Sequence, residues 1–127
     1  MSTWTNTGIA GGSLGAQGTF NGCENLETVK FPATLQTIGG NAFLNCKKIE
    51  TLVFPDTIYS ITTNAFNGCT GIISVTFNRD VYEMGTGGSG FNATAGIPGN
   101  DNLKAAALAG GIGTYIRTGE DTWTKQP

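Results

Sequence analysis

Three cysteines, Cys23, Cys46 and Cys69, are the residues of this chain best suited to chemistry, and they recur at equal intervals in the sequence. A metal site normally needs closely spaced ligands such as Cys-x-x-Cys, which the sequence lacks. Three thiols cannot all pair, and an odd count also fits a free thiol or an intermolecular bond. If the equal spacing places the cysteines at equivalent positions of neighbouring strands, their Cβ atoms lie about 4.8 Å apart. This distance is wider than the roughly 3.8 Å between the Cβ atoms of a disulfide. We therefore expect three reduced core thiols, with no metal and no cofactor.

A glycine-rich segment, Gly85-Thr86-Gly87-Gly88-Ser89-Gly90, matches the Gly-x-Gly-x-x-Gly fingerprint of dinucleotide-binding sites. Such a site needs a strand before the motif, a helix directly after it and an acidic residue about 20 positions on. Only the short segment 91–127 follows the motif, and the nearest expected helix begins no earlier than Asn100. The segment is therefore interpreted as a loop insertion.

Other groups that could carry catalysis are few. The chain has no histidine, which removes the commonest general base and metal ligand. The acidic pair Glu120-Asp121 lies in an expected turn, where both side chains are solvated. Asn92-Ala93-Thr94 has the pattern of a glycosylation acceptor, but such triplets arise by chance in threonine-rich chains. The residue types therefore predict a protein that is not an enzyme.

Composition excludes further classes of protein. The 127 residues fit one domain, and seven Lys and Arg are scattered among nine acids for a net charge of −2. Because no basic cluster is present, nucleic acid is not an expected partner. No run of about 18 apolar residues occurs, so no membrane span is expected. Residues 1–7 lack the charged start and apolar stretch of a secretory signal.

The cysteine spacing is one part of a longer 23-residue period. Each unit reads Phe-x-x-Cys-x-x-Leu-x-x-Val-x-Phe-Pro-x-x-Leu-x-x-Ile with similar replacements, and such a period is typical of a solenoid of stacked repeats. Stacked repeats present surfaces rather than deep clefts, which favours binding over catalysis. The recurring apolar columns are Phe20, Phe43 and Phe66; Leu26, Ile49 and Ile72; Val29, Leu52 and Val75; Phe31, Phe54 and Phe77; Leu35, Ile58 and Val81; and Ile38, Ile61 and Met84.

Local patterns place secondary structure within each unit. Apolar side chains two residues apart predict strands that face inward on alternate residues. Pro32 and Pro55 follow the first two strands, where a residue without an N–H group cannot extend a hydrogen-bonded ladder. Residues 41–46 and 64–69 are expected to form single helical turns capped by their leading asparagines. The expected strands are Val29–Phe31, Leu52–Phe54 and Val75–Phe77.

The pattern weakens at both ends of the chain. Residues 1–19 hold apolar residues at irregular spacing and are interpreted as a degenerate N-terminal coil, followed by the regular repeats of residues 20–84. Phe91 comes two positions later than a regular repeat after Phe66 would place it, and no cysteine stands three positions beyond it, which indicates a further coil with an insertion. Residues 85–127 are interpreted as this irregular coil and a C-terminal cap, because an end repeat needs a cover.

The expected cap contains one helix and one β-hairpin. Asp101–Ala109 is rich in alanine, with Asn100 or Asp101 as the N-cap and Gly110 as the end. An apolar pocket between the last coil and this helix could hold a small hydrophobic ligand. The expected hairpin strands are Tyr115–Arg117 and Thr122–Thr124, on either side of a four-residue turn.

The central repeats carry a family resemblance. They read Ile38-Gly39-Gly40-Asn41-Ala42-Phe43-x-x-Cys46-x-x-Ile49-x-x-Leu52-x-Phe54-Pro55, which closely resembles the BspA-type leucine-rich repeat of bacterial and protozoan surface antigens. The resemblance covers roughly residues 20–84. It implies a short, curved, right-handed and β-rich leucine-rich-repeat solenoid. It also implies secretion or display at the cell surface, adhesion to host or bacterial proteins, and no catalytic residues.

The candidate binding site is the outward face of the expected strands, which we call the strand face. Residues flanking the buried positions form an acidic edge, a Thr/Thr/Ser column and a Lys/Val/Thr column. Val53 and Ile73 are informative, because neighbouring apolar side chains on a polar sheet indicate contact with another molecule. Thr and Val could also stand there for their strand propensity alone. The strand face comprises Glu27, Thr28, Lys30, Glu50, Thr51, Val53, Ile73, Ser74 and Thr76.

Two functional hypotheses follow from these patterns. The first is a non-enzymatic protein-binding and adhesion module that presents the strand face to an unidentified host or bacterial surface protein. Three strands offer less than the roughly 800 Å² per partner of a standard interface, so binding is weak or the protein self-associates. The second hypothesis is a structural protein that forms homo-oligomers through an open solenoid end at residues 1–19, where strand edges of two chains meet.

Overall fold

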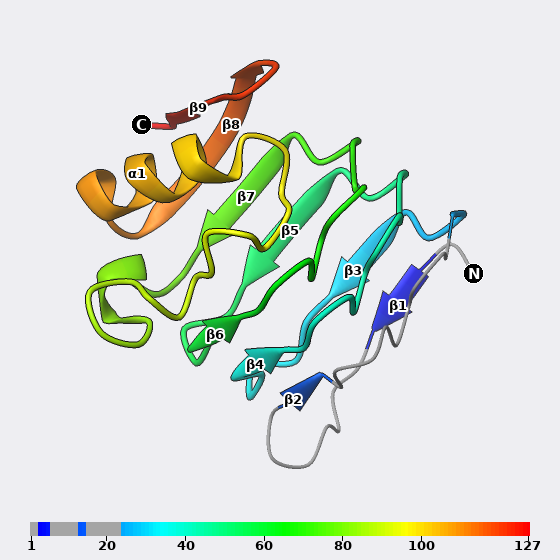
Figure 1. Cartoon of the computed structure of the whole chain (residues 1–127), viewed down its shortest axis with the longest axis horizontal. Coiled ribbons are helices and arrows are strands. Elements are labelled where there is room, and N and C mark those ends of the chain that lie inside the picture. Colours follow the sequence, from blue (N-terminus) through cyan, green and yellow to red (C-terminus); the bar gives the residue numbers. More distant parts are fainter. Residues whose placement is uncertain (1–2, 6–12, 15–23) are drawn as a thin grey trace.

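The computed structural model describes residues 3–5, 13–14 and 24–127 of the chain. Successive strands lie side by side, and one helix lies near the C-terminal end of the row (Figure 1). The expectations for Phe20 and Cys23 concern residues outside the described ones. The strands are β1 (Thr3–Thr5), β2 (Ser13–Leu14), β3 (Thr28–Lys30), β4 (Thr37–Ile38), β5 (Thr51–Phe54), β6 (Ser60–Ile61), β7 (Ser74–Phe77), β8 (Gly113–Gly119) and β9 (Thr122–Lys125), and the helices are η2 (Val81–Glu83) and α1 (Asn100–Gly110).

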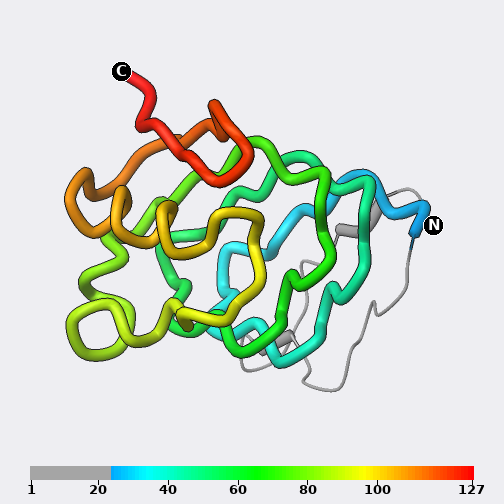
Figure 2. Tube along the Cα trace, turned by 45° about the horizontal axis from the view of Figure 1, so that its top comes forward, coloured from blue at the N-terminus to red at the C-terminus, as the bar shows by residue number. Residues whose placement is uncertain are grey.

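Parallel strands repeat at the period of the sequence. β5 pairs with β7, with Thr51 opposite Ser74, and β4 pairs with β6, with Thr37 opposite Ser60. Both pairings join equivalent positions of successive 23-residue units. Each repeat therefore adds one strand to the series of β5 and β7 and one strand to the series of β4 and β6. Figure 2 shows the Cα trace winding through these turns next to one another. The expected repetitive, β-rich fold is confirmed.

The described residues before position 24 extend the same arrangement. β1 pairs in parallel with β3, with Thr3 opposite Thr28, and β2 pairs in parallel with β4, with Ser13 opposite Thr37. The first offset exceeds the regular period by two positions and the second by one position. The irregular apolar spacing of this segment therefore reflects a longer unit with the same strand order.

A continuous stack of aromatic rings runs through the core. Phe31, Phe54 and Phe77 stack in order, with ring centroids 5.6 and 5.4 Å apart. In a second column, Phe43 stacks on Phe66 at 5.3 Å with an interplanar angle of 1°. The columns also touch, because Phe54 meets Phe66 edge-on at 6.1 Å. Stacked and edge-to-face rings at these distances gain energy beyond that of burial.

The turns after β4 and β6 differ from the expected helical turns. No helix forms there, and Asn41 and Asn64 both adopt left-handed backbone angles with φ of 60°. Asparagine tolerates this conformation better than most residues. The Cys46 N–H donates to the Phe43 carbonyl at 3.2 Å, a bond typical of a tight turn. The expectation of an asparagine N-cap is therefore wrong, because the chain reverses in tight turns instead.

The expectation that Phe91 follows Phe66 in the phenylalanine column is also wrong. The structure bridges Phe91 to Ile61, so Phe91 occupies the isoleucine column. The cause is length, because this unit is longer than the regular 23-residue unit and the extra residues form turns. Phe91 still joins the aromatic stack, with its ring centroid 5.6 Å from that of Phe77.

A helix and a hairpin form in the C-terminal segment, as the sequence predicts. α1 begins at Asn100, so the N-cap position is occupied by Gly99 and not by Asn100 or Asp101. Gly99 has a left-handed φ of 65°. β8 pairs antiparallel with β7, and β9 pairs antiparallel with β8, which gives a sheet of order β5-β7-β8-β9. α1 packs against β9, where the backbone N–H of Trp123 donates to Asn102 Oδ1 at 2.7 Å. The helix therefore packs against the sheet at its last strand, β9.

Arg117 joins the hairpin to the last regular repeat. Its Nε donates to the Ile72 carbonyl and its Nη2 to the Thr70 carbonyl, both at 2.9 Å. Its Nη1 donates to the Glu120 carbonyl in the hairpin turn at 3.1 Å. One guanidinium thereby satisfies three backbone acceptors and fixes the hairpin against the repeats.

Cys46 and Cys69 are both fully buried in the core. Cys69 is a free thiol, and its Sγ donates to the Phe43 carbonyl at 2.9 Å. A hydrogen bond with Cys46, together with burial, raises the pKa of the Cys69 thiol far above its ordinary value. The Cys69 thiol therefore remains protonated and unreactive at neutral pH.

Replacing Phe43 by alanine should be strongly destabilising. Phe43 is fully buried between the rings of Phe31 and Phe66, so its removal leaves a cavity in the stack. We expect Phe43→Ala to lower the free energy of unfolding by about 3–5 kcal/mol. Urea denaturation followed by circular dichroism measures this change, and a loss below about 1 kcal/mol would contradict a continuous stack.

Stability should also fall at alkaline pH. Burial, followed by the nearby Asp80 carboxylate, raises the pKa of Tyr115, as hydrogen bonding and burial do for Cys69. Each group keeps its proton to higher pH in the folded chain, so its stabilising contribution is complete at neutral pH. It is lost as the pH rises above the unfolded values of about 8.5 for a thiol and about 10 for a phenol.

Unfolding free energies measured from neutral pH to about pH 11 should decline by up to about 1.4 kcal/mol per pH unit for each group. Cys69→Ala should make the decline near pH 9 shallower than in the parent protein. A flat profile in the parent, or an unchanged slope in the variant, would show that the fold does not hold these groups protonated.

Candidate functional site

The strand face forms one surface along β3, β5 and β7. Val53 and Ile73 are 48% and 46% exposed, which is high for large apolar side chains in a folded protein. The parallel register places Thr51 beside Ser74 and Val53 beside Thr76. Ser74 and Thr76 are half-buried, and the exposed members are Glu27, Thr28, Lys30, Glu50, Thr51, Val53 and Ile73.

The strand face continues onto the C-terminal hairpin, which the sequence does not predict. β8 lies antiparallel beside β7, with Ile116 opposite Ser74 and Thr114 opposite Thr76. The hydroxyl groups of Thr76 and Thr114 are 2.8 Å apart and share a hydrogen bond. Pairing with β8 explains why Ser74 and Thr76 on β7 are only half-exposed. Alternating residues predict a strand near Tyr115, but nothing in its sequence indicates which neighbour it joins.

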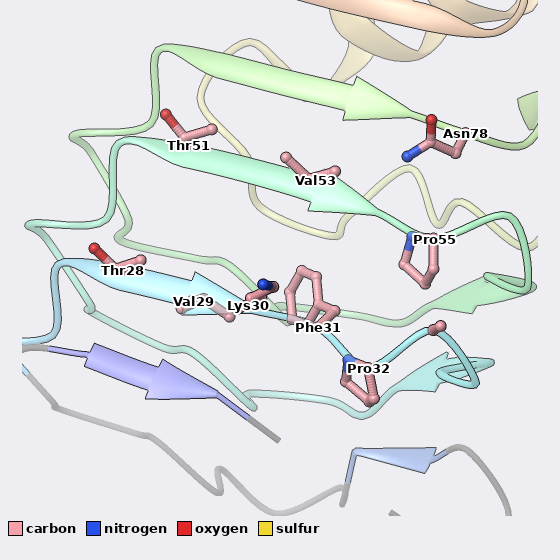
Figure 3. Close-up of a pocket in the computed structure, with 10 residues that line it drawn as sticks. Thr28, Val29, Lys30, Phe31, Pro32, Thr51, Val53, Pro55 and Asn78 are labelled. Atoms are coloured by element: carbon pink, nitrogen blue, oxygen red, sulfur yellow. The ribbon is translucent and has the colours of Figure 1, made fainter. Parts of the chain in front are cut away.

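A hollow of about 720 Å³ opens between β3 and β5, and we call it the β3–β5 hollow (Figure 3). Its volume lies in the range of about 300–1,000 Å³ that is typical of ligand pockets. Apolar groups of Phe31, Pro32, Val53 and Pro55 contribute to its wall, and polar groups of Thr28, Thr51 and Asn78 lie around them. The hollow thus includes the exposed apolar side chain of Val53.

The hollow coincides with an interruption of the strand ladder. Among the described strands, β3 is hydrogen-bonded in a sheet with β1, whereas β5 belongs to the sheet with β7, β8 and β9. Between β7 and β5, Asn78 donates its N–H and its side-chain amide to the Phe54 carbonyl at 3.3 and 3.0 Å. Pro55 occupies the position equivalent to Asn78 one repeat earlier and has no N–H to donate. The proline therefore favours separation of β3 from β5.

Charges on this surface are separated along the strands. Lys30 is the only charged residue among those that line the β3–β5 hollow. A second hollow of about 370 Å³ adjoins it through Thr28 and Thr51, and Glu27, Lys48 and Glu50 supply its charges. The surface therefore has a cation at the end of β3 and a net negative charge at the start of β3 and β5.

Other expected features do not gather into a site for chemistry. In the described ranges, no cluster of three or more His, Cys, Asp or Glu residues could hold a metal ion. The glycine-rich segment from Gly85 to Gly90 forms turns, and α1 begins only at Asn100. A hollow of about 430 Å³ near the start of α1 has Asn100, Asp101 and Asp121 in its wall. Within the described residues, no helix is long and apolar enough to cross a membrane.

Comparison with known proteins gives one family and one related structure. The family model of the BspA type leucine rich repeat region (6 copies) matches residues 16–94. The crystal structure of the leucine rich repeat protein TpLRR of T. pallidum is 34% identical, with a TM-score of 0.41. That match covers 42% of this chain and 25% of the TpLRR chain, so it spans a quarter of that protein. No curated protein matches the sequence.

Proposed function

Because this chain belongs to the BspA-type leucine-rich repeat family, we propose that it is a non-enzymatic protein-binding module that presents its strand face to another protein. Membership of this family supports a repeat module for protein interaction. The adhesive role and the place of action are our further proposals. Proteins of this family are often associated with the cell surface, which supports secretion or surface display and an adhesion partner of host or bacterial origin.

The observation that carries this proposal is the exposure of Val53 and Ile73 in the two outer columns of the strand face, in adjacent repeats. Both side chains are nearly half exposed, although most large apolar side chains of the described repeats are fully buried. Threonines, Lys30 and two glutamates surround them at fixed positions of a regular strand arrangement. Protein interfaces commonly combine exposed apolar side chains with surrounding polar ones in this way.

The area available for binding is larger than three strands alone provide. β8 and β9 continue the sheet beyond β7, so Thr114 and Ile116 lie next to the β7 residues of the strand face. This extension supports an interface that approaches the standard size of roughly 800 Å² per partner. Because the strands are held by ladder hydrogen bonds and the aromatic stack, little ordering entropy is lost on binding.

The domain organisation that we propose is a single right-handed solenoid over residues 1–127. Residues 1–19 form its N-terminal coil, residues 20–84 its regular 23-residue repeats, and residues 85–127 an irregular coil with a C-terminal cap. The parallel registers of β4 with β6 and of β5 with β7 support the repeat length. The packing of α1 against β9 and the bonds of Arg117 to the last repeat support a capping role.

A second candidate function is self-assembly through the N-terminal end of the solenoid. β1 and β2 each end a sheet, so among the described strands each has a pairing partner on one side only. Exposed strand edges can pair with the same edge of a second chain. In that case light scattering detects a mass that rises with concentration, whereas a constant monomer mass removes this candidate.

Charge reversal on the strand face should abolish binding of the partner. We expect the triple variant Lys30→Glu, Val53→Asp and Ile73→Asp to lose proteins that the parent chain captures from surface-biotinylated bacterial or host cells. The physical reason is that two carboxylates then replace the exposed apolar side chains of the interface, where a buried unpaired charge is costly. Quantitative mass spectrometry of the captured proteins measures the loss.

A matched control makes the same three chemical changes away from the strand face. Lys104→Glu and Leu108→Asp lie on α1, and Ile112→Asp lies just after it. This control should retain the captured proteins, and circular dichroism should show both variants folded. Equal capture by the parent and the strand-face variant would place the interface elsewhere.

A further inference from the structure

The β3–β5 hollow differs from the rest of the sheet in how it exposes the core. Val29 and Phe31, which face inward from β3, are 7% and 9% exposed, whereas the equivalent β5 residues Leu52 and Phe54 are fully buried. Val29 and Phe31 both line the hollow, as do the outward-facing Lys30 and Val53 (Figure 3). The hollow therefore reaches apolar surface on both sides of β3, which a ligand could remove from water.

The shape of the hollow follows the direction of the strands. Its polar end lies near Thr28 and Thr51, and its apolar end lies near Pro32 and Pro55, where the two prolines stand in equivalent positions of successive repeats (Figure 3). Five residue steps along the strand, from Glu27 to Pro32, extend about 17 Å. An extended peptide of five residues has a comparable length.

The charges determine the chemistry of the occupant. Lys30 alone supplies charge within the hollow, so it favours a carboxylate there. Glu27 and Glu50 outnumber Lys48 in the adjoining hollow, so that end favours a cation. Along the strands the order is the acidic end at Glu27 and Glu50, then Lys30, then the apolar end at the two prolines. A ligand complementary to the whole surface therefore carries a carboxylate between a cationic group and an apolar side chain. A purely apolar ligand leaves the acidic end and Lys30 without partners.

We propose that the β3–β5 hollow binds an extended segment of the partner protein in which an acidic residue lies between a basic residue and an apolar residue. This inference rests on the proposed function, because it names the part of the partner that the strand face recognises. Alternate residues of an extended segment point to the same side. The basic, acidic and apolar residues therefore stand two positions apart along the segment.

An NMR titration with a defined peptide tests this recognition directly. The probe is acetyl-Arg-Thr-Glu-Thr-Phe-amide, which presents its charged and aromatic side chains on one side when extended. Added at millimolar concentration to ¹⁵N-labelled protein, it should shift the amide signals of Thr28–Phe31 and Thr51–Val53. The isomer acetyl-Arg-Thr-Phe-Thr-Glu-amide has the same composition but exchanges the acidic and aromatic positions, and it should bind several-fold more weakly.

Charge exchange distinguishes specific recognition from nonspecific apolar contact. Lys30→Glu should weaken binding of the first peptide roughly fivefold, because an attractive pair becomes a repulsive one. A peptide with its glutamate changed to lysine should recover affinity on this variant but bind the parent more weakly. The matched control Lys104→Glu on α1 should bind like the parent, and the spectrum of each variant shows whether it is folded.

Four results would overturn the inference. They are the absence of shifts at millimolar peptide, shifts that lie outside β3 and β5, equal binding of the two isomers, and equal binding of free phenylpropionate, which would mark a site for small apolar acids. Shifts in β3 and β5 that depend on protein concentration alone would instead assign the hollow to a second copy of the chain. If the peptide fails while the triple strand-face variant still loses its captured proteins, the proposed function stands and only this inference falls.

Discussion

The rings of Phe43 and Phe66 lie 5.3 Å apart and almost parallel, and contacts of this kind between successive repeats hold the structure together. Each ring packs on the equivalent ring of the next repeat and on the neighbouring column, so no repeat can bury its apolar side alone. The strand register, in which each strand is offset from the next by one repeat, follows from this stacking. The outward-facing side chains of successive strands consequently lie in columns, and these columns form the strand face.

The proposed binding function depends on one departure from that regularity. Asn78 bonds to the Phe54 carbonyl through both its N–H and its side chain, and the two strands remain joined. Pro55, at the equivalent position one repeat earlier, cannot do so, and an apolar hollow opens between β3 and β5. The aromatic stack continues beneath the hollow from Phe31 to Phe54, so the opening does not divide the core. A rigid fold can therefore expose apolar surface locally without losing its repeat register.

Much of this fold could be predicted from the sequence because one period controls it. Most of the buried columns, the inward strands, and the helix and hairpin near the C-terminus follow from residue types and their spacing, but Phe91 and not Met84 pairs with Ile61. The position of Phe91 could not be predicted, because the period does not indicate how many residues an insertion adds. The pairing of β8 with β7 depends on packing between distant segments. The β3–β5 hollow was missed although the difference between Pro55 and Asn78 is visible in the sequence, because its effect depends on the separation of two strands.

A double-mutant cycle between Phe43 and Phe66 tests the central role of the aromatic stack most directly. Phe43→Leu, Phe66→Leu and the double variant keep the core apolar while removing the ring contact. If the rings stabilise each other across repeats, the two losses of unfolding free energy should fail to add by about 0.5–1.5 kcal/mol. Losses that add to within about 0.3 kcal/mol would show that the rings act independently, and would contradict the account.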